Sequence, residues 1–156
     1  MRLEYFQMLD GIETLDTEKA SLVAVAHVPL KSPVFEGHFP GHPIMPGVLL
    51  LETMAQAAGY LLMSLEGFAR MPFLASAKTA NFRSFVMPGS TLQVTASRLH
   101  SGSGYAVMAT SLECGGQRVG DAQLMMRILA FPSDALAQHV KQEGQRLGFL
   151  RTVEAG

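Results

Sequence analysis

The 156-residue chain has few charged residues and only one cysteine. Charged residues make up 16% of it, and 12 Lys and Arg against 13 Asp and Glu give a formal net charge of -1. The sequence contains no basic stripe and no acidic tail, so neither nucleic acid nor an anionic membrane surface is an expected partner. Cys114 alone cannot form an internal disulfide, which is typical of a protein from a reducing compartment.

The N-terminal segment MRLEYFQMLD lacks the basic-then-apolar pattern of a secretory signal peptide. The chain also lacks internal repeats and low-complexity stretches. Its length suits one domain, and 48% hydrophobic residues supply enough material for a core. We therefore expect a cytoplasmic protein with a single domain over residues 1–156.

Residues 47–65 form a nearly continuous apolar stretch that is rich in good helix formers. Pro46 stands just before them, where a first-turn proline is tolerated. The helix would be about 28 Å long, which is also enough for a membrane span. Glu52 and Gln56 near its middle, together with the lack of flanking basic residues, argue against a span. Because the stretch is apolar on almost every side, we expect a helix that is surrounded by protein.

Segments of β-type composition lie on both sides of this helix, and glycine and proline turns separate them. Short connections favour antiparallel neighbours. Residues 31–46 are rich in proline and glycine, so neither a helix nor a regular strand is expected there. The order predicts an α+β fold, with an antiparallel sheet wrapped around a long central helix. The expected strands are residues 12–16, 21–29, 72–82, 91–100, 105–113 and 118–131, and residues 132–156 are expected to form an extra tail with a surface helix from Ser133 to Leu147.

Glu52 is an ionisable residue inside an otherwise apolar helix, and Gln56 lies one turn later on the same face. Burying an unpaired carboxylate is costly, so burial favours the protonated form that a general acid needs near neutral pH. Taken alone, Glu52 is interpreted equally well as a structural acid that hydrogen-bonds to Gln56.

His38 lies in a stiff loop, flanked by Phe39 and Pro40. A neutral imidazole held there can remove a proton at physiological pH, although a histidine that only caps a turn is the commoner case. His42 follows at a metal-ligand spacing, but Pro40 and Pro43 exclude the helix that would bring the two rings together. No third ligand lies nearby in the sequence. We therefore expect neither a metal site nor a cofactor.

Gly47 stands at the start of the predicted helix, where its N–H and the helix dipole favour negative charge. Such a donor can stabilise a thioester oxygen as it gains charge, whereas the simpler interpretation is a tight turn after Pro46. His38, Glu52 and Gly47 together suit removal of an α-proton and loss of a β-hydroxyl as water. Their spacing alone does not identify that reaction.

Three stretches resemble the signature of the bacterial 3-hydroxyacyl-[acyl-carrier-protein] dehydratases: GHFPG at 37–41, PGV at 46–48 and ETMAQ at 52–56. The similarity continues through FRSFVMPG at 82–89 and covers residues 4–131. The resemblance implies the hot-dog fold. It also implies conversion of 3-hydroxyacyl thioesters on acyl carrier protein to trans-2-enoyl thioesters, in fatty acid or lipid A acyl chain synthesis.

By this resemblance His38 is the base and Glu52 the acid, contributed by opposite subunits of a homodimer. Gly47 offers its N–H to the thioester carbonyl, and Gln56 orients Glu52. The acyl chain runs in an apolar tunnel at the dimer interface, and three dimers often assemble into a hexamer. A glutamate at the acid position, where the isomerising branch carries aspartate, implies dehydration without isomerisation of the double bond.

The chain departs from the family pattern in two places. The N-terminal Pro-His-Arg-Tyr-Pro stretch is absent, and Arg83, Ser84 and Phe85 replace two basic residues and a proline that help to hold the acidic carrier. With its longer tail, the chain is similar to a branch that serves very-long-chain acyl groups of lipid A in some Gram-negative bacteria. A hot-dog acyl thioesterase and a non-catalytic acyl-binding subunit are the alternatives.

Overall fold

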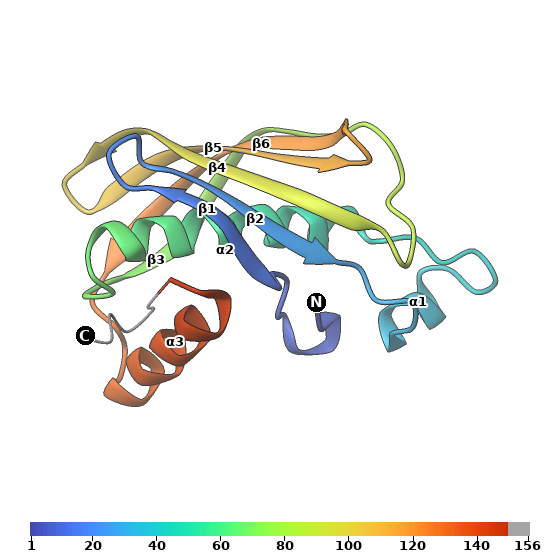
Figure 1. The fold of residues 1–156 in the computed structure, drawn as a ribbon, viewed down its shortest axis with the longest axis horizontal. Coiled ribbons are helices and arrows are strands. Elements are labelled where there is room, and N and C mark those ends of the chain that lie inside the picture. Colours follow the sequence, from blue (N-terminus) through green and yellow to red (C-terminus); the bar gives the residue numbers. More distant parts are fainter. Residues whose placement is uncertain (150–156) are drawn as a thin grey trace, which may run out of the picture.

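The computed structural model describes residues 1–149, in which an antiparallel sheet curves around one long helix (Figure 1). Its six strands follow the order β1-β2-β4-β5-β6-β3. The predicted α+β arrangement of a sheet around a central helix is thereby confirmed. The strands are β1 (Gly11–Asp16), β2 (Ser21–His27), β3 (Met71–Phe82), β4 (Thr91–Gly102), β5 (Tyr105–Cys114) and β6 (Gln117–Leu129). The helices are η1 (Leu3–Tyr5), α1 (Pro33–Gly37), α2 (Gly47–Leu65) and α3 (Asp134–Leu147).

Helix α2 begins and ends at the predicted residues and lies across the concave face of the sheet (Figure 1). It is long and apolar enough to cross a membrane, but 61% of its most apolar window is buried inside the protein, as expected for a core helix. The helix is mostly surrounded by protein, as expected, but its beginning is more open within the single chain, where Val48 is 74% exposed and Glu52 is half-buried. One face of α2 is left uncovered by the sheet.

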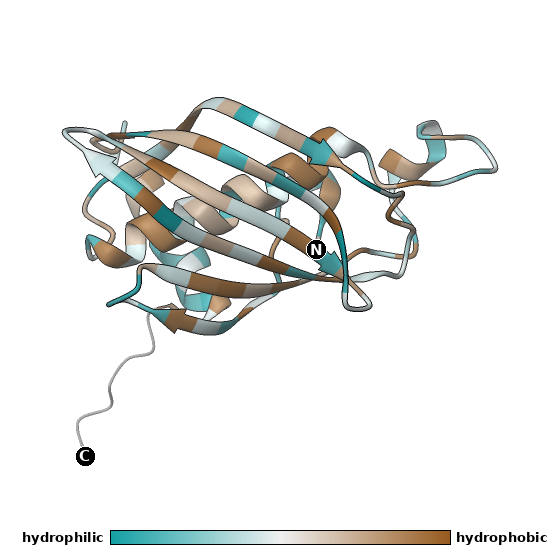
Figure 2. Cartoon of the chain, turned by 90° about the horizontal axis from the view of Figure 1, so that it is seen from above, coloured by the Kyte–Doolittle hydropathy of each residue, from teal (hydrophilic) through white to brown (hydrophobic). Residues whose placement is uncertain are grey.

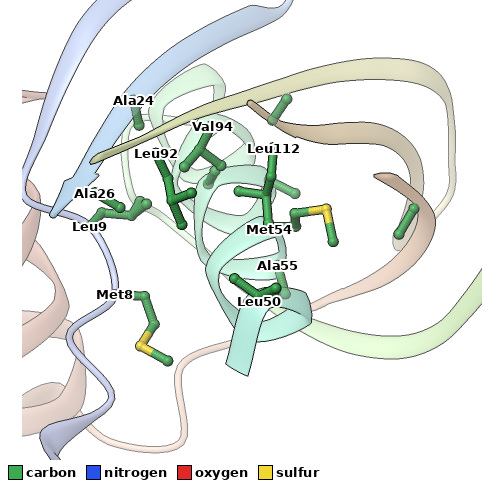
Figure 3. Close-up of a cluster of buried hydrophobic side chains, with 14 of the residues drawn as sticks. Met8, Leu9, Ala24, Ala26, Leu50, Met54, Ala55, Leu92, Val94 and Leu112 are labelled. Atoms are coloured by element: carbon green, nitrogen blue, oxygen red, sulfur yellow. The ribbon is translucent and has the colours of Figure 1, made fainter. Parts of the chain in front are cut away.

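Small side chains let α2 approach the sheet closely. Ala57 and Ala58 of the helix are fully buried, and so are Ala24, Ala26 and Ala96 of the sheet. Side chains alternate between the two faces of β2 and β4, and this alternation directs the sheet alanines toward the helix. Figure 2 shows the alternating hydropathy along the strands from above. Larger side chains pack around the first turns of α2, as Figure 3 shows for Leu50, Met54, Leu92, Val94 and Leu112.

The prediction that residues 31–46 contain no helix is wrong for a short part of them. Helix α1 covers Pro33–Gly37, and the side chain of Ser32 caps it by accepting a hydrogen bond from the N–H of Val34 at 3.2 Å. Pro33 occupies the first helical position, where its missing N–H has no partner to lose. A proline-rich stretch therefore begins with one capped turn of helix and continues as a loop.

The expectation that consecutive strands are neighbours fails for β3 and β4. Strand β3 pairs with β6 at the edge of the sheet, whereas β4 pairs with β2 and β5. The turn between them is bonded to the end of β2: Val28 donates to Ser90 at 2.8 Å, and Gly89 donates to Val28 at 3.0 Å. These bonds direct β4 toward β2, so the chain crosses the sheet before the β4-β5-β6 meander begins.

Helix α3 lies in the tail, where a helix from Ser133 to Leu147 is predicted. The hydroxyl of Ser133 accepts from the N–H of Leu136 at 3.2 Å, as an N-cap does. Gly148 ends the helix with φ 102°, a conformation that glycine adopts without steric cost. The helix lies against the open side of α2, near the N-terminal segment (Figure 1). The last part of the predicted tail, residues 150–156, lies outside the described residues.

Replacing Leu61 with alanine is expected to lower the free energy of unfolding by about 2–5 kcal/mol, because the side chain leaves a cavity where the sheet meets α2. Leu61 is 0% exposed, whereas Leu99, the matched control, is 58% exposed. Urea unfolding followed by circular dichroism measures both variants. An equal loss for Leu61→Ala and Leu99→Ala would contradict this account of the core.

Candidate active site

His38 is held at the end of α1 by bonds to both of its backbone groups. Its N–H donates to Val34 at 3.0 Å, and its carbonyl accepts from the N–H of Ile44 at 3.0 Å. The Phe39 ring stacks on the imidazole with 4.1 Å between the ring centroids. The loop therefore fixes both the backbone and one face of this histidine, as its proline content predicts.

The side chain of His38 is also oriented. Its Nδ1 lies 3.0 Å from the carbonyl oxygen of Ile44. A carbonyl oxygen only accepts, so the neutral imidazole carries its proton on Nδ1 and leaves the lone pair of Nε2 free. This is the tautomer that a general base needs.

Gly47 begins α2, and the ring of Phe82 packs against it. A Cβ added at Gly47 would lie 3.5 Å from the Phe82 ring. Leu49 and Leu50 both donate to the carbonyl of Pro46, so the Gly47 N–H precedes the hydrogen-bond ladder of the helix. Gly47 therefore presents a backbone donor at the positive end of the helix dipole.

Glu52 and Gln56 are in contact one turn apart on α2. The side-chain amide of Gln56 donates to Oε1 of Glu52 at 3.0 Å. The other carboxyl oxygen, Oε2, does not take part in this hydrogen bond. Both side chains are half-buried. The contact predicted for this pair is present, and it fixes the direction in which the carboxyl points.

The N-terminal segment holds Gln56 from the other side. Oε1 of Gln56 accepts from the N–H of Met8 at 3.1 Å, and its Nε2 donates to the carbonyl of Phe6 at 2.5 Å. Sequence reasoning missed this support because both partners are backbone atoms, which any residue at position 6 and any residue except proline at position 8 would supply. The amide group is thus locked in one orientation, with its Nε2 toward Glu52.

A cavity of about 590 Å³ opens beside Glu52. Its lining is mostly apolar and comes from α2, the N-terminal segment, the start of β3, Met126 of β6, and α3. Glu52 and Gln56 line it, whereas His38 and Gly47 are not among the lining residues in the described part of the chain. A single chain therefore brings the predicted acid, Glu52, and its hydrogen-bond partner Gln56 to the cavity, but not the predicted base, His38.

Arg83 is held by the protein itself. Its guanidinium binds Asp121, with Nε 3.1 Å from Oδ2, and Asn81 donates to the other carboxylate oxygen at 3.1 Å. The hydrogen bond from Asn81, and then Arg83, lower the pKa of Asp121. Arg83 is therefore an ion-pair partner of β6, which contains Asp121.

Comparison with solved structures supports the fold. A hypothetical thioesterase with coenzyme A from Streptococcus pneumoniae superposes with a TM-score of 0.62 over 78% of this chain and 87% of that chain, at 17% identity. At this identity the likeness concerns the arrangement of sheet and helix alone, because one fold carries many functions.

Sequence comparison identifies the family. The profile of the FabA-like domain matches residues 2–123. The chain is 36% identical over 117 residues to the 3-hydroxyacyl-[acyl-carrier-protein] dehydratase FabZ of Pediococcus pentosaceus, covering 74% of this chain and 78% of the relative. It is 37% identical over 121 residues to the FabZ of Syntrophotalea carbinolica, covering 76% and 82%. The chain therefore belongs to the FabA-like domain family, which includes the FabZ 3-hydroxyacyl-[acyl-carrier-protein] dehydratases.

Proposed function

We propose that the protein removes water from 3-hydroxyacyl thioesters carried on acyl carrier protein and releases trans-2-enoyl thioesters. The observation that carries this proposal is the Glu52 carboxyl, oriented by Gln56 at the edge of a mostly apolar cavity. A general acid needs a fixed direction and a place for the acyl chain beside it, and this arrangement provides both. The identity to FabZ dehydratases supports the same reaction.

In the proposed reaction, Nε2 of His38 removes the α-proton and the thioester oxygen gains negative charge. The N–H of Gly47 stabilises that oxygen. Protonated Glu52 gives its proton to the β-hydroxyl as the C–O bond breaks, so that a double bond forms and water leaves. Return of the proton from His38 to Glu52 through solvent restores both residues for the next turnover.

The proposal includes a homodimer in which His38 of one protomer faces Glu52 of the other. It is supported by the absence of His38 from the lining of the Glu52 cavity within residues 1–149. Strand β3 also has a free edge and is exposed over most of its length, including Phe73, Leu74 and Phe82. An exposed apolar edge strand is a ready site for pairing with a second copy.

The finer assignments belong to the same proposal. We place the enzyme in the cytoplasm, in the synthesis of fatty acid or lipid A acyl chains, as a dimer or as a hexamer of three dimers. The single Cys114, which cannot form an internal disulfide, supports a reducing compartment. The long tail supports a branch that handles long acyl chains.

Mass spectrometry of 3-hydroxyacyl carrier-protein thioesters mixed with the protein tests the reaction. We expect loss of water, and a decrease of about 10²–10⁴-fold in rate for His38→Ala and for Glu52→Gln, which is the usual contribution of a general base or acid. His42→Ala is the control, because His42 is an exposed histidine in the same loop. Release of free thiol without an enoyl product would indicate a thioesterase, and intact substrate would indicate a subunit that only binds acyl groups.

Mixing the His38→Ala and Glu52→Gln proteins tests the shared site. Random exchange places the mutations on different subunits in half of the dimers, and each such dimer keeps one intact site, so activity should recover to about a quarter of the original. Subunit exchange is followed by native mass spectrometry. Exchange without recovered activity would place both residues of a site in one chain.

Gln56→Leu tests the orientation of Glu52. Loss of a hydrogen bond to the catalytic carboxyl should lower kcat by about 10–100-fold with little change in KM, because the contact matters most as the proton moves. Gln93→Leu is the control, since Gln93 donates to Glu13 on the surface at 3.1 Å. A raised KM with unchanged kcat would show that Gln56 shapes the cavity and does not orient the acid.

A further inference from the structure

Helix α3 lines the Glu52 cavity although it lies outside the matched family residues. The family profile ends at residue 123, and α3 covers Asp134–Leu147. Six residues of α3 line the same cavity as Glu52: Leu136, His139, Val140, Glu143, Arg146 and Leu147. A segment outside the residues that match the family profile therefore forms one wall of the candidate active-site cavity.

A stripe along α2 connects Glu52 to that wall. Six residues of the helix line the cavity, and they recur at intervals of three and four residues: Glu52, Ala55, Gln56, Gly59, Tyr60 and Met63. Such spacings place side chains on one helix face, and the stripe from Glu52 to Met63 is about 16 Å long. Its first turn carries the acid and the amide, and the rest carries glycine, aromatic and thioether groups. The polar end is thus where a reacting group fits, and the far end suits an alkyl chain.

Helix α3 is fastened in this position at several points. Val140 and Leu147 are buried, and Arg146 donates through Nη2 to the carbonyl of Leu9 at 3.1 Å. The ring of Phe149 stacks on Tyr60 with 5.5 Å between centroids and meets Phe68 edge-on at 6.2 Å. These contacts tie α3 to α2 and to the N-terminal segment that holds Gln56.

The polar groups of this wall, apart from the exposed His139, are paired or neutral, which is compatible with an apolar ligand. Glu143 and Arg146 form an ion pair at 3.0 Å, so their charges are matched within α3. Burial, and then Glu143, raise the pKa of Tyr60 to about 12, so its hydroxyl is neutral at physiological pH. The cavity volume of about 590 Å³ lies within the range of small-molecule sites.

We propose that α3 is a specificity element, against which the far end of a long acyl chain comes to rest. The chain runs from Glu52 along the α2 stripe and ends at Leu136 and Val140, so that α3 selects long-chain 3-hydroxyacyl thioesters. This inference rests on the proposed dehydratase function. Each methylene that the cavity buries changes binding by about fourfold, so a few methylenes are enough for strong selection.

The proposal is tested with tryptophan side chains that fill the end of the cavity far from Glu52. Val140→Trp and Leu136→Trp are assayed with 3-hydroxybutyryl, 3-hydroxydecanoyl and 3-hydroxyhexadecanoyl thioesters of acyl carrier protein. The ratio of kcat/KM on the hexadecanoyl substrate to that on the butyryl substrate should fall by more than about tenfold, the equivalent of two displaced methylenes. Lys141→Trp places the same side chain on the exposed side of α3 and should leave the ratio unchanged.

Circular dichroism and thermal unfolding show whether each variant is folded. Val140→Ala is the second measure, because it enlarges the cavity without a bulky insertion and should raise the same ratio on the longest substrates. An unchanged ratio in folded tryptophan variants would overturn the proposal for α3, whether or not kcat/KM falls equally at all chain lengths. The dehydratase function would then stand. Absence of dehydration by the unmodified protein at every chain length would instead overturn the proposed function.

Discussion

The fit of α2 against the concave sheet is the constraint on which the other features depend. Alanines on both surfaces bring the helix close to the strands, and in a close-packed core that position leaves little freedom to shift. Because the sheet covers only one side, the opposite stripe of α2 is left for other segments. Glu52 lies on that stripe, so the packing that stabilises the fold also determines which way the carboxyl faces.

The open side of α2 is covered by segments from both ends of the chain. The N-terminal segment supplies two backbone partners to Gln56, and α3 binds that segment through Arg146 and the carbonyl of Leu9. A continuous set of contacts therefore runs from α3 through the N-terminal segment to Gln56 and then to Glu52. Changes in the tail can reach the acid by this route without touching it, which is why measurements that separate kcat from KM are informative here.

The sequence predicts what depends on local order and misses what depends on long-range pairing. The bounds of α2 follow from Pro46 and a nearly continuous apolar run, and the fixed imidazole of His38 follows from the rigid loop around it. The sequence does not predict α1, because the side chain of Ser32 caps the helix and stabilises one turn despite the prolines nearby. The place of β3 was missed because the bonds of Val28 to the turn at 89–90 have no sequence signal. Support of Gln56 by backbone atoms was invisible for the same reason.

The division between matched and unmatched residues has a physical basis. Dehydration needs a base, an acid and an oxyanion donor at fixed geometry, and the residues proposed for these roles lie in the family-matched part of the chain. Acyl chain length is sensed by apolar contact, which is non-directional and tolerates many side chains. An appended helix such as α3 can therefore change the depth of the cavity while the reacting groups keep their positions. Substitutions in α3 can thus change the selection for acyl chain length, although α3 lies far in the sequence from the residues proposed to carry the chemistry.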